Sequence, residues 1–330
     1  MSKNYLPLYS MQKLKCAVIG VGYLGRFHAQ KYQLLDNAEL VGVCDVNEVG
    51  CKAVAEELSV PAFFDYRELF GQVDAVSIAA TTIHHYTIAK DCLMHGIHVL
   101  IEKPITETVA QAQELIALAK KHQVKLQVGH MERFNAARLA LDDYLDNPLF
   151  IESHRLAPYN PRGADVNVIL DLMIHDIDII QSIVRSPITH IEAQGAPILS
   201  SSIDIANARI TFKNHCVANV TASRISFKTE RKMRIFQANT YLSIDYHEKQ
   251  FAVFQKGEGE MFPGIPDIIR HQSAFEKTDA LLEEIKAFIR CITMDETPVV
   301  SGEDGCAALE TATLITSIIN NNLLARDATK

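Results

Sequence analysis

A glycine-rich turn between a short apolar run and a helical pattern constrains this sequence most. The run Cys16-Ala17-Val18-Ile19 has the character of a buried strand, and Gly20-Val21-Gly22-Tyr23-Leu24-Gly25 follows it directly. Helical spacing of apolar residues then continues to Leu35. A Gly-x-Gly-x-x-Gly turn that joins a strand to a helix is the context in which this motif binds the diphosphate of a dinucleotide.

Each glycine has its own physical reason in that interpretation. Gly20 permits a tight turn, Gly22 has no Cβ to block a diphosphate, and Gly25 lets the helix pack closely on the strand. The unpaired N–H groups at the start of the helix attract phosphates. A glycine-rich turn without a ligand is the alternative. We predict that the cofactor site includes Gly20, Gly22, Tyr23, Leu24 and Gly25.

A carboxylate follows the second predicted strand, residues 39–44. Asp45 comes twenty residues after Gly25, where an acidic side chain accepts hydrogen bonds from the hydroxyls of an adenosine ribose. A 2′-phosphate beside Asp45 would meet a like-charge repulsion of at most about 4 kcal/mol at ~4 Å, for an effective dielectric constant of ~20. The sequence therefore favours NAD over NADP.

Composition narrows the class of protein. The 330 residues allow two domains, and 48% hydrophobic residues can fill two cores. A net charge of −8 disfavours nucleic acid and anionic membranes as partners. No apolar run reaches membrane-spanning length, and 1–13 lacks the core of a signal peptide. Seven cysteines without a Cys-x-x-Cys pair indicate reduced thiols, so we expect a cytoplasmic protein.

Strand and helix patterns alternate as far as residue 130. After Asp45 they predict helices at 48–58, 85–95 and 107–122 and strands at 61–64, 74–80, 97–101 and 124–128. This alternation is typical of an α/β fold with a parallel sheet covered on both faces. We therefore predict that residues 1–130 form an NAD-binding Rossmann domain with a doubly wound parallel sheet.

The pattern changes after residue 131. It predicts helices at 135–145, 168–184, 278–293 and 302–324, a loop at 257–266, and strands at 150–156, 188–193, 203–212, 216–224, 232–238, 242–246 and 251–255. Short turns between these strands favour a mostly antiparallel, open-faced sheet in an α+β domain. We assign substrate binding and oligomerisation to residues 131–330.

One candidate for the chemistry stands at the end of a predicted parallel strand. Glu102-Lys103-Pro104 follows the strand at 97–101, and a lysine at that edge would point toward a bound nicotinamide. There Lys103 would orient a substrate hydroxyl or stabilise a developing alkoxide. A plain ion pair between Glu102 and Lys103 is the alternative.

A second candidate lies on the apolar helix at 168–184. Asp171, His175 and Asp178 are spaced i, i+4 and i+7 and share one helix face. Unpaired charges are costly on a buried helix, so these side chains require partners, a cofactor or a wet cleft. The imidazole of His175 is suited to take a proton from an alcohol near neutral pH, and Asp171 would fix its tautomer or hold the substrate. A hydrogen-bond cluster without chemistry is the alternative.

Two weaker groups complete the candidates. Thr81, Thr82 and His85 follow the strand at 74–80 and would line the nicotinamide ribose; a threonine that simply caps the helix is the alternative. The histidines at 84 and 85, together with Asp171 and His175, do not have a spacing that requires a metal, and we predict none. A predicted loop before the apolar helix supplies side chains that would grip a phosphate or diphosphate, unless they are simply solvated: Arg155, Tyr159 and Arg162.

In this order the motifs resemble the Gfo/Idh/MocA oxidoreductase family. The similarity spans nearly the whole chain: the turn at 20–25, Thr82 and His85, 102–104, Arg133-Phe134-Asn135, and Asp171 with His175. It implies an NAD(P)-dependent dehydrogenase of sugars or polyols and a homodimer or homotetramer. It also implies that Glu102 belongs to the cofactor site and that Lys103, Asp171 and His175 are catalytic, with His175 as proton acceptor.

Departures from the family pattern point to a subgroup. Thr81 replaces a common proline, and Val166, Asn167 and Met173 replace usual glycines. The stretch 171–176 looks like that of enzymes that oxidise UDP-N-acetylglucosamine at carbon 3, which implies a nucleotide sugar as substrate. The alternatives are a dehydrogenase of a free sugar or inositol, and a non-catalytic NAD(P)-binding sensor or co-regulator of the same fold.

Overall fold

The computed structural model describes residues 13–160, 166–275 and 278–327, and their contacts form two units. The first holds the described residues through Glu102, with Gln111–Gly129 and Leu281–Ser301; the second holds Lys103–Ala110, the described part of His130–Ala280, and the residues from Gly302 on. The chain therefore passes between the units several times, whereas the sequence suggested one division at residue 130. The assignment of cofactor to one domain and substrate to the other stays a prediction.

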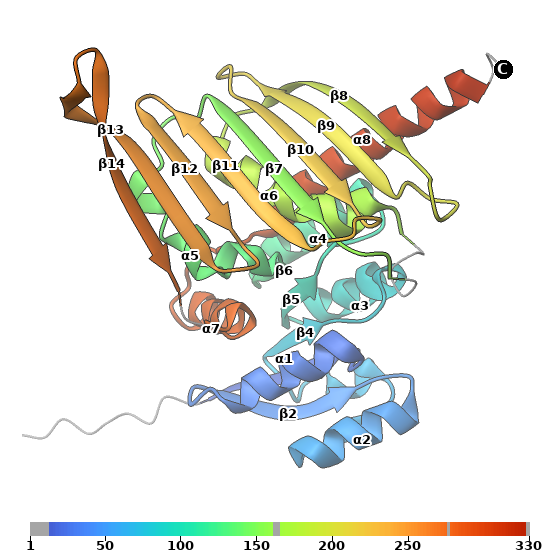
Figure 1. The fold of residues 1–330 in the computed structure, drawn as a ribbon. Coiled ribbons are helices and arrows are strands. Elements are labelled where there is room, and N and C mark those ends of the chain that lie inside the picture. Colours follow the sequence, from blue (N-terminus) through green and yellow to red (C-terminus); the bar gives the residue numbers. More distant parts are fainter. Residues whose placement is uncertain (1–12, 161–165, 276–277, 328–330) are drawn as a thin grey trace, which may run out of the picture. The chain divides into compact units, whose positions relative to one another are not determined.

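The first unit contains a six-stranded parallel sheet in the order β3-β2-β1-β4-β5-β6 (Figure 1). Its strands are β1 (Leu14–Ile19), β2 (Ala38–Cys44), β3 (Ala62–Phe63), β4 (Ala75–Ile78), β5 (His98–Glu102) and β6 (Leu126–Gly129). This order reverses direction between β1 and β4, where doubly wound sheets bind nucleotides. The predicted Rossmann topology is confirmed.

Helices pack on this sheet through short apolar faces. They are α1 (Tyr23–Gln33), α2 (Glu48–Leu58), α3 (Thr82–Met94), α4 (Val109–His122) and α7 (Ala280–Thr293), with a 3₁₀ turn at Tyr66–Leu69. Asn47 caps α2 by accepting a hydrogen bond from the N–H of Gly50. Tyr32 lies on the buried face of α1 and forms a 2.8 Å hydrogen bond with Ser77 of β4. The sequence did not show that α7 packs with this unit.

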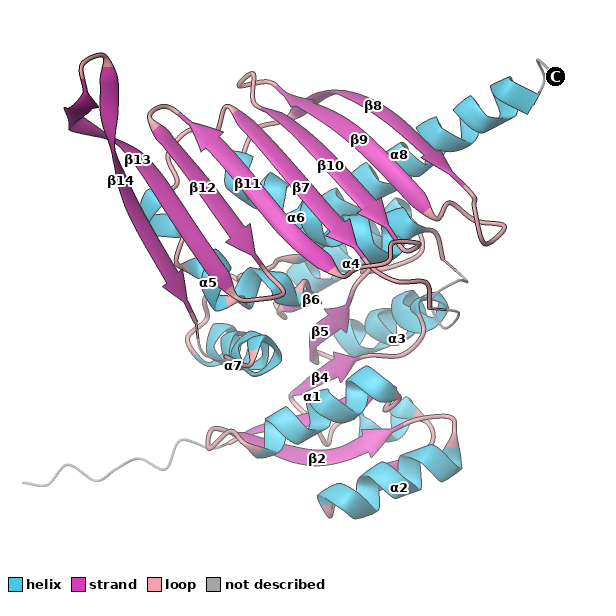
Figure 2. Ribbon diagram, viewed as in Figure 1, coloured by secondary structure: helices cyan, strands magenta, loops and turns pink. Residues whose placement is uncertain are grey.

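The second unit contains an eight-stranded sheet in the order β14-β13-β12-β11-β7-β10-β9-β8 (Figure 2). Its strands are β7 (Phe150–Leu156), β8 (Ile188–Ala196), β9 (Ile205–Phe212), β10 (Val217–Ser223), β11 (Glu230–Gln237), β12 (Thr240–Asp245), β13 (Gln250–Phe262) and β14 (Ile265–Ala274). Only the β7–β10 pair is parallel. The predicted mostly antiparallel sheet is confirmed.

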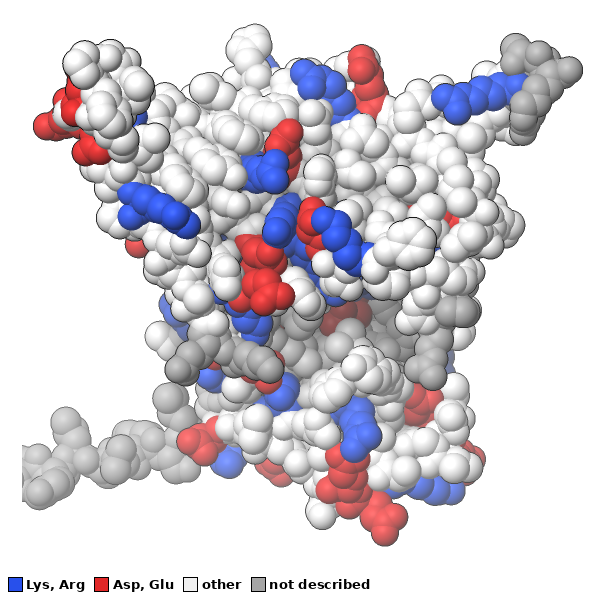
Figure 3. All heavy atoms as spheres, in the orientation of Figure 1, with Lys and Arg blue, Asp and Glu red and all other residues white. Residues whose placement is uncertain are grey.

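Helices cover one face of this second sheet. They are α6 (Ile174–Val184) and α8 (Gly302–Asp327), and the short α5 (Ala136–Leu139) lies near β12 and β13. Ala218, Val220 and Ala222 alternate along β10 and point into the shared core. The other face is open, and basic and acidic side chains are interspersed on the surface seen in Figure 3. An ion pair between Glu152 and Arg234, 3.4 Å long, is an example.

Two local predictions were wrong. Residues 257–266 form the ends of β13 and β14 around a turn at Gly264 rather than a loop, because two strands pair here despite Gly257, Gly259 and Pro266. The predicted helix at 135–145 shortens to α5 and a 3₁₀ turn at Asp142–Tyr144. The predicted helix at 168–184 is confirmed; its first part, Ile169–Met173, is π-helical, and α6 continues it. No helix of the described chain is long and apolar enough to span a membrane.

Candidate active site

The glycine turn has the geometry that its motif predicts. Gly20 has a positive φ of 84°, and a Cβ at this position would lie 2.5 Å from the backbone nitrogen of Ala80. A Cβ at Gly25 would lie 1.8 Å from the carbonyl oxygen of Gly20, so only glycine fits there. A Cβ at Gly22 would meet no atom within 4 Å. Packing therefore requires the outer two glycines, and the middle one faces open space that a ligand can approach.

A cavity of about 470 Å³ lies over the carboxyl ends of β1, β2 and β4. Gly22 is the N-cap of α1 and the helix start has no side-chain cap, so its first N–H groups are available to an anion. Asp45 lines the same cavity; its carboxylate accepts hydrogen bonds from the N–H of Val21 at 2.8 Å and of Asn47 at 2.9 Å. An open cradle, uncapped amides and an oriented carboxylate fit a dinucleotide. Tyr23 and Leu24 occupy the first turn of α1.

The residues after β4 divide between this cavity and the interior. Thr81 lines the cavity and is the N-cap residue of α3, but its side chain makes no capping hydrogen bond. Thr82 is the first residue of α3. His85 is buried and its Nε2 lies 2.9 Å from the carbonyl oxygen of Ala80, whereas the neighbouring His84 lines the cavity. The family resemblance singled out His85, whereas His84 is the histidine that lines the cavity.

Lys103 and Asp171 meet within the second unit. The ammonium group of Lys103 donates a hydrogen bond of 2.8 Å to the carbonyl oxygen of Asp171 and lies 3.5 Å from its Oδ1. Glu102, the last residue of β5, is buried and accepts a 2.9 Å hydrogen bond from Nε2 of His28. The alternative prediction was an ion pair between Glu102 and Lys103. In the structure Glu102 instead contacts His28, and Lys103 contacts Asp171. The sequence did not indicate the contact with His28.

His175 lies one turn after Asp171, at the start of α6. Burial lowers its pKa well below the usual value, and the positive charges of Lys103, Arg155 and Arg231 and the neighbouring His130 lower it further. The rings of His130 and His175 are perpendicular, with their centroids 6.2 Å apart. Among the described residues, Nδ1 of His175 has no hydrogen-bond partner. The imidazole is therefore neutral near pH 7 and is able to accept a proton.

Asp178 has a structural partner instead. Its two carboxylate oxygens accept hydrogen bonds from Nε and Nη2 of Arg133, at 2.7 and 3.0 Å. Both side chains are largely removed from solvent. The expectation that the charged residues of this helix face require partners is thus met for Asp178. Because Arg133 occupies its carboxylate, we assign Asp178 no role in the chemistry.

Arg155 lies in the strand predicted at 150–156 and not in the following loop, with which its proposed phosphate contact was grouped. It lies in β7, is only 2% exposed, and its guanidinium donates to Asp176 at 2.8 and 3.2 Å and to Glu132 at 2.9 Å. A phosphate could reach this guanidinium only by displacing two buried carboxylates. Arg155 is therefore placed to form ion pairs in the interior and not to bind a substrate phosphate. Tyr159 follows β7 and is 37% exposed, and its role stays a prediction. Arg162 lies outside the described residues.

Comparisons with known proteins agree with this geometry. Residues 14–130 match the family model "Oxidoreductase family, NAD-binding Rossmann fold", and residues 136–241 match "GFO/IDH/MocA C-terminal domain". UDP-N-acetylglucosamine 3-dehydrogenase from Acidithiobacillus ferrooxidans is 37% identical over 303 residues, which cover 92% of this chain and 96% of that one. Myo-inositol 2-dehydrogenase from Thermotoga maritima is 27% identical over 315 residues, covering 90% and 93%.

A solved structure of the Acidithiobacillus ferrooxidans enzyme superimposes with a TM-score of 0.88 at 34% identity, covering 94% of this chain and 98% of that chain. The two family models together account for more than half of the sequence. The chain therefore belongs to the Gfo/Idh/MocA family and is an NAD(P)-dependent oxidoreductase acting on CH–OH groups.

Proposed function

We propose that this protein oxidises the 3-hydroxyl of a UDP-linked N-acetylhexosamine, UDP-N-acetylglucosamine, to a ketone with NAD. One observation carries the chemistry: His175 is buried, its Nδ1 has no hydrogen-bond partner among the described residues, and burial and the charge of Lys103 lower its pKa. The assignment of the substrate rests on the similarity to UDP-N-acetylglucosamine 3-dehydrogenase along nearly the full length of both chains. The myo-inositol 2-dehydrogenase relative is less similar in sequence, so a free polyol is the second candidate substrate.

The cavity of the first unit supplies the groups that would hold the cofactor. The amides at the start of α1 would bind the diphosphate, and the open space at Gly22 would admit it. Asp45 would accept hydrogen bonds from the adenosine ribose, and its negative charge supports NAD rather than NADP. When bound, the nicotinamide accepts a hydride from the substrate carbon.

His175 would take the hydroxyl proton of the substrate. A base whose pKa lies well below neutrality is already deprotonated at neutral pH, so no preceding ionisation is needed. The lowered pKa also makes it a weak base, and the reaction therefore needs help in stabilising the alkoxide. The positive charges that lower the pKa of His175, Lys103 foremost among them, supply that help.

Lys103 and Asp171 would position the hydroxyl between them. The ammonium of Lys103 has three protons, and Asp171 accepts through its carbonyl and carboxylate oxygens. This arrangement fixes the direction of the ammonium, which would donate to the substrate oxygen when the substrate binds. Lys103 would then stabilise the negative charge that develops as His175 removes the proton.

A substrate panel tests the proposal. Purified protein is incubated with NAD and, separately, UDP-N-acetylglucosamine, UDP-glucose, N-acetylglucosamine, myo-inositol and scyllo-inositol, and NADH formation is followed by absorbance. We expect UDP-N-acetylglucosamine to give the highest kcat/KM, and mass spectrometry to show a product two mass units lighter. Turnover of a free inositol with no signal from any nucleotide sugar would refute the substrate assignment.

A further inference from the structure

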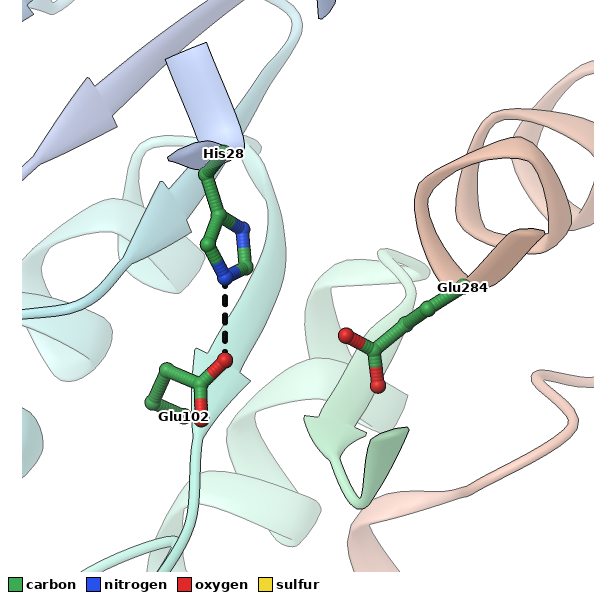
Figure 4. Close-up of side chains that lie close together, drawn as sticks. All are labelled: His28, Glu102 and Glu284. Carbon is green, nitrogen blue, oxygen red and sulfur yellow. Dashed lines mark hydrogen bonds and ion pairs between the residues drawn. The ribbon is translucent and has the colours of Figure 1, made fainter. Parts of the chain in front are cut away.

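A buried group of three titratable side chains lies in the first unit, beside the end of β5. His28 comes from α1, Glu102 from β5 and Glu284 from α7, and they are 1%, 8% and 0% exposed. One ligand atom of each lies within 4.8 Å of one atom of each of the others. Figure 4 shows the carboxyl group of Glu284 pointing toward the His28–Glu102 pair. Two buried carboxyl groups thus lie close to each other.

The charges of this group do not balance if both carboxyls are ionised. His28 and Glu102 are joined by a 2.9 Å hydrogen bond, but neither carboxyl oxygen of Glu284 has a hydrogen-bond partner among the described residues. An ionised carboxylate without partners is very costly in a protein interior. Burial, and the negative charge of Glu102, raise the pKa of Glu284 well above its usual value. Burial and the neighbouring Glu102 therefore both favour the neutral acid form of Glu284.

Two other buried titratable groups of this unit carry no charge. Burial raises the pKa of Tyr32, which donates to or accepts from Ser77, and that of Cys16, so both are neutral near pH 7. Glu102 and His28 are hydrogen-bonded to each other, and Nδ1 of this histidine lacks a hydrogen-bond partner in the described chain. A proton on Glu284 removes the repulsion between the two neighbouring carboxyl groups.

Packing fixes Glu102 in this arrangement. A Cβ at Gly129 would lie 2.9 Å from the carboxyl carbon of Glu102, so the side chain lies against bare backbone. On the other side, the backbone carbonyl of Glu284 accepts a 3.2 Å hydrogen bond from Gln127, which ties α7 to β6. Lys103 is the next residue after Glu102, so whatever orients Glu102 also fixes the backbone from which Lys103 leaves β5.

We propose that Glu284 and His28 are positioning residues: Glu284 holds the shared proton of a Glu284–Glu102 carboxyl pair, and both residues fix Glu102 and thereby the backbone at Lys103. This inference rests on the proposed function, because it concerns the lysine assigned there to substrate binding. The ligand atoms of Glu284 and Glu102 lie within 4.8 Å of each other, so the proposal requires the two carboxyl groups to approach until the O–H of Glu284 donates to Glu102. The proton stays within the pair and the group does not take part in hydride transfer.

Two substitutions at Glu284 distinguish a positioning role of this side chain from a purely structural one. In Glu284→Gln the amide retains a donor toward Glu102, whereas Glu284→Leu has similar volume and no donor. Glu283→Gln is the matched control, because Glu283 is the preceding residue of α7, exposed and paired with Lys286. We expect turnover near the wild-type value in Glu284→Gln and a fall of about 10- to 100-fold in Glu284→Leu. NADH affinity should not change, and Glu284→Leu should be at least as stable as the wild type.

Two spectroscopic measurements do not depend on turnover. The infrared C=O band of a protonated carboxylic acid should be present at neutral pH in the wild type and Glu283→Gln, and absent in both Glu284 variants. In protein labelled with ¹⁵N-lysine, the Nζ resonance of Lys103, assigned with Lys103→Met, should shift in Glu284→Leu and stay in place in Glu284→Gln. If no sugar is oxidised, the proposed function fails and these two measurements still decide the inference.

Three results would overturn this inference. One is an acid band that is missing from the wild type or survives in Glu284→Gln. Another is an unchanged Lys103 resonance, or wild-type turnover, in Glu284→Leu. The third is stoichiometric zinc in the purified protein that is lost in Glu284→Gln, because the carboxyls would then be ionised on a cation.

Discussion

The proposed cofactor site can be tested most directly by removing the negative charge of Asp45 and measuring the preference for NADH over NADPH. The carboxylate of Asp45 is held by two backbone N–H groups, so it does not turn away easily from a ligand in the cavity. At ~4 Å and an effective dielectric constant of ~20, it would repel each negative charge of a 2′-phosphate by about 4 kcal/mol. Asp45 is partly exposed, and solvent screening reduces this to about 1–3 kcal/mol, or roughly 5- to 150-fold in affinity.

Asp45→Asn removes the charge and keeps one acceptor for the backbone. We expect the ratio of NADPH to NADH dissociation constants, measured by cofactor fluorescence without any substrate, to fall by that factor. Most of the change should come from tighter NADPH binding, and NADH should bind slightly less well because one ribose acceptor is lost. Glu48→Gln is the control, because it removes an equal charge from the exposed first turn of α2.

Two results would contradict this reasoning. If Glu48→Gln changes the ratio as much as Asp45→Asn, the effect is one of overall charge and not of contact with the ribose. If the wild type binds NADPH as tightly as NADH, Asp45 does not exclude the 2′-phosphate. Arg67, which lines the same cavity and already forms ion pairs with Asp65 and Asp91, would then be the residue that accommodates it.

Three further predictions follow from the second unit. Lys103→Met should lower kcat by about 10²- to 10⁴-fold with NADH affinity unchanged, and near-normal rates would remove this lysine from the mechanism. Because the pKa of His175 is lowered, the acidic limb of the kcat/KM profile should lie below about pH 6.5; protonation of this histidine in the unfolded chain should also reduce stability as pH falls below that value. Arg155→Met should cost about 3–5 kcal/mol in urea unfolding, whereas Arg234→Met, at an exposed pair, should cost about 1 kcal/mol or less.

The first unit could be predicted closely because its signals are local. Turn chemistry at Gly20 and Gly25 is set by atoms a few residues away or on the adjacent strand, and it needs no knowledge of distant contacts. Buried parallel strands are continuous apolar runs, so β1, β2, β4 and β5 were visible as such. The resemblance to the family added the order of the motifs along the chain.

What could not be predicted depends on partners far apart in sequence. Arg155 carries the same charge whether it is solvated or buried, and only the fold brings Asp176 and Glu132 to it. Glu284 likewise gives no sign in the sequence that it faces Glu102, 182 residues away. The β13–β14 hairpin was missed because exposed strands with Gly and Pro lack the alternation that marks a buried face.

The helical segment that carries His175 also explains why this residue stays neutral. It holds three aspartates, and each has a cationic partner from a different element: Lys103 for Asp171, Arg155 for Asp176 and Arg133 for Asp178. A carboxylate left unpaired beside the imidazole would favour its protonated form, because an opposite charge stabilises the cation. Burial lowers the pKa of His175 most, and the positive charges of Lys103 and Arg155 lower it further. Substituting either of these two cations should therefore raise the pKa of the proposed base as well as disturb packing. A matched rise in the acidic limb of the rate profile would connect the ion pairs of this segment with its chemistry.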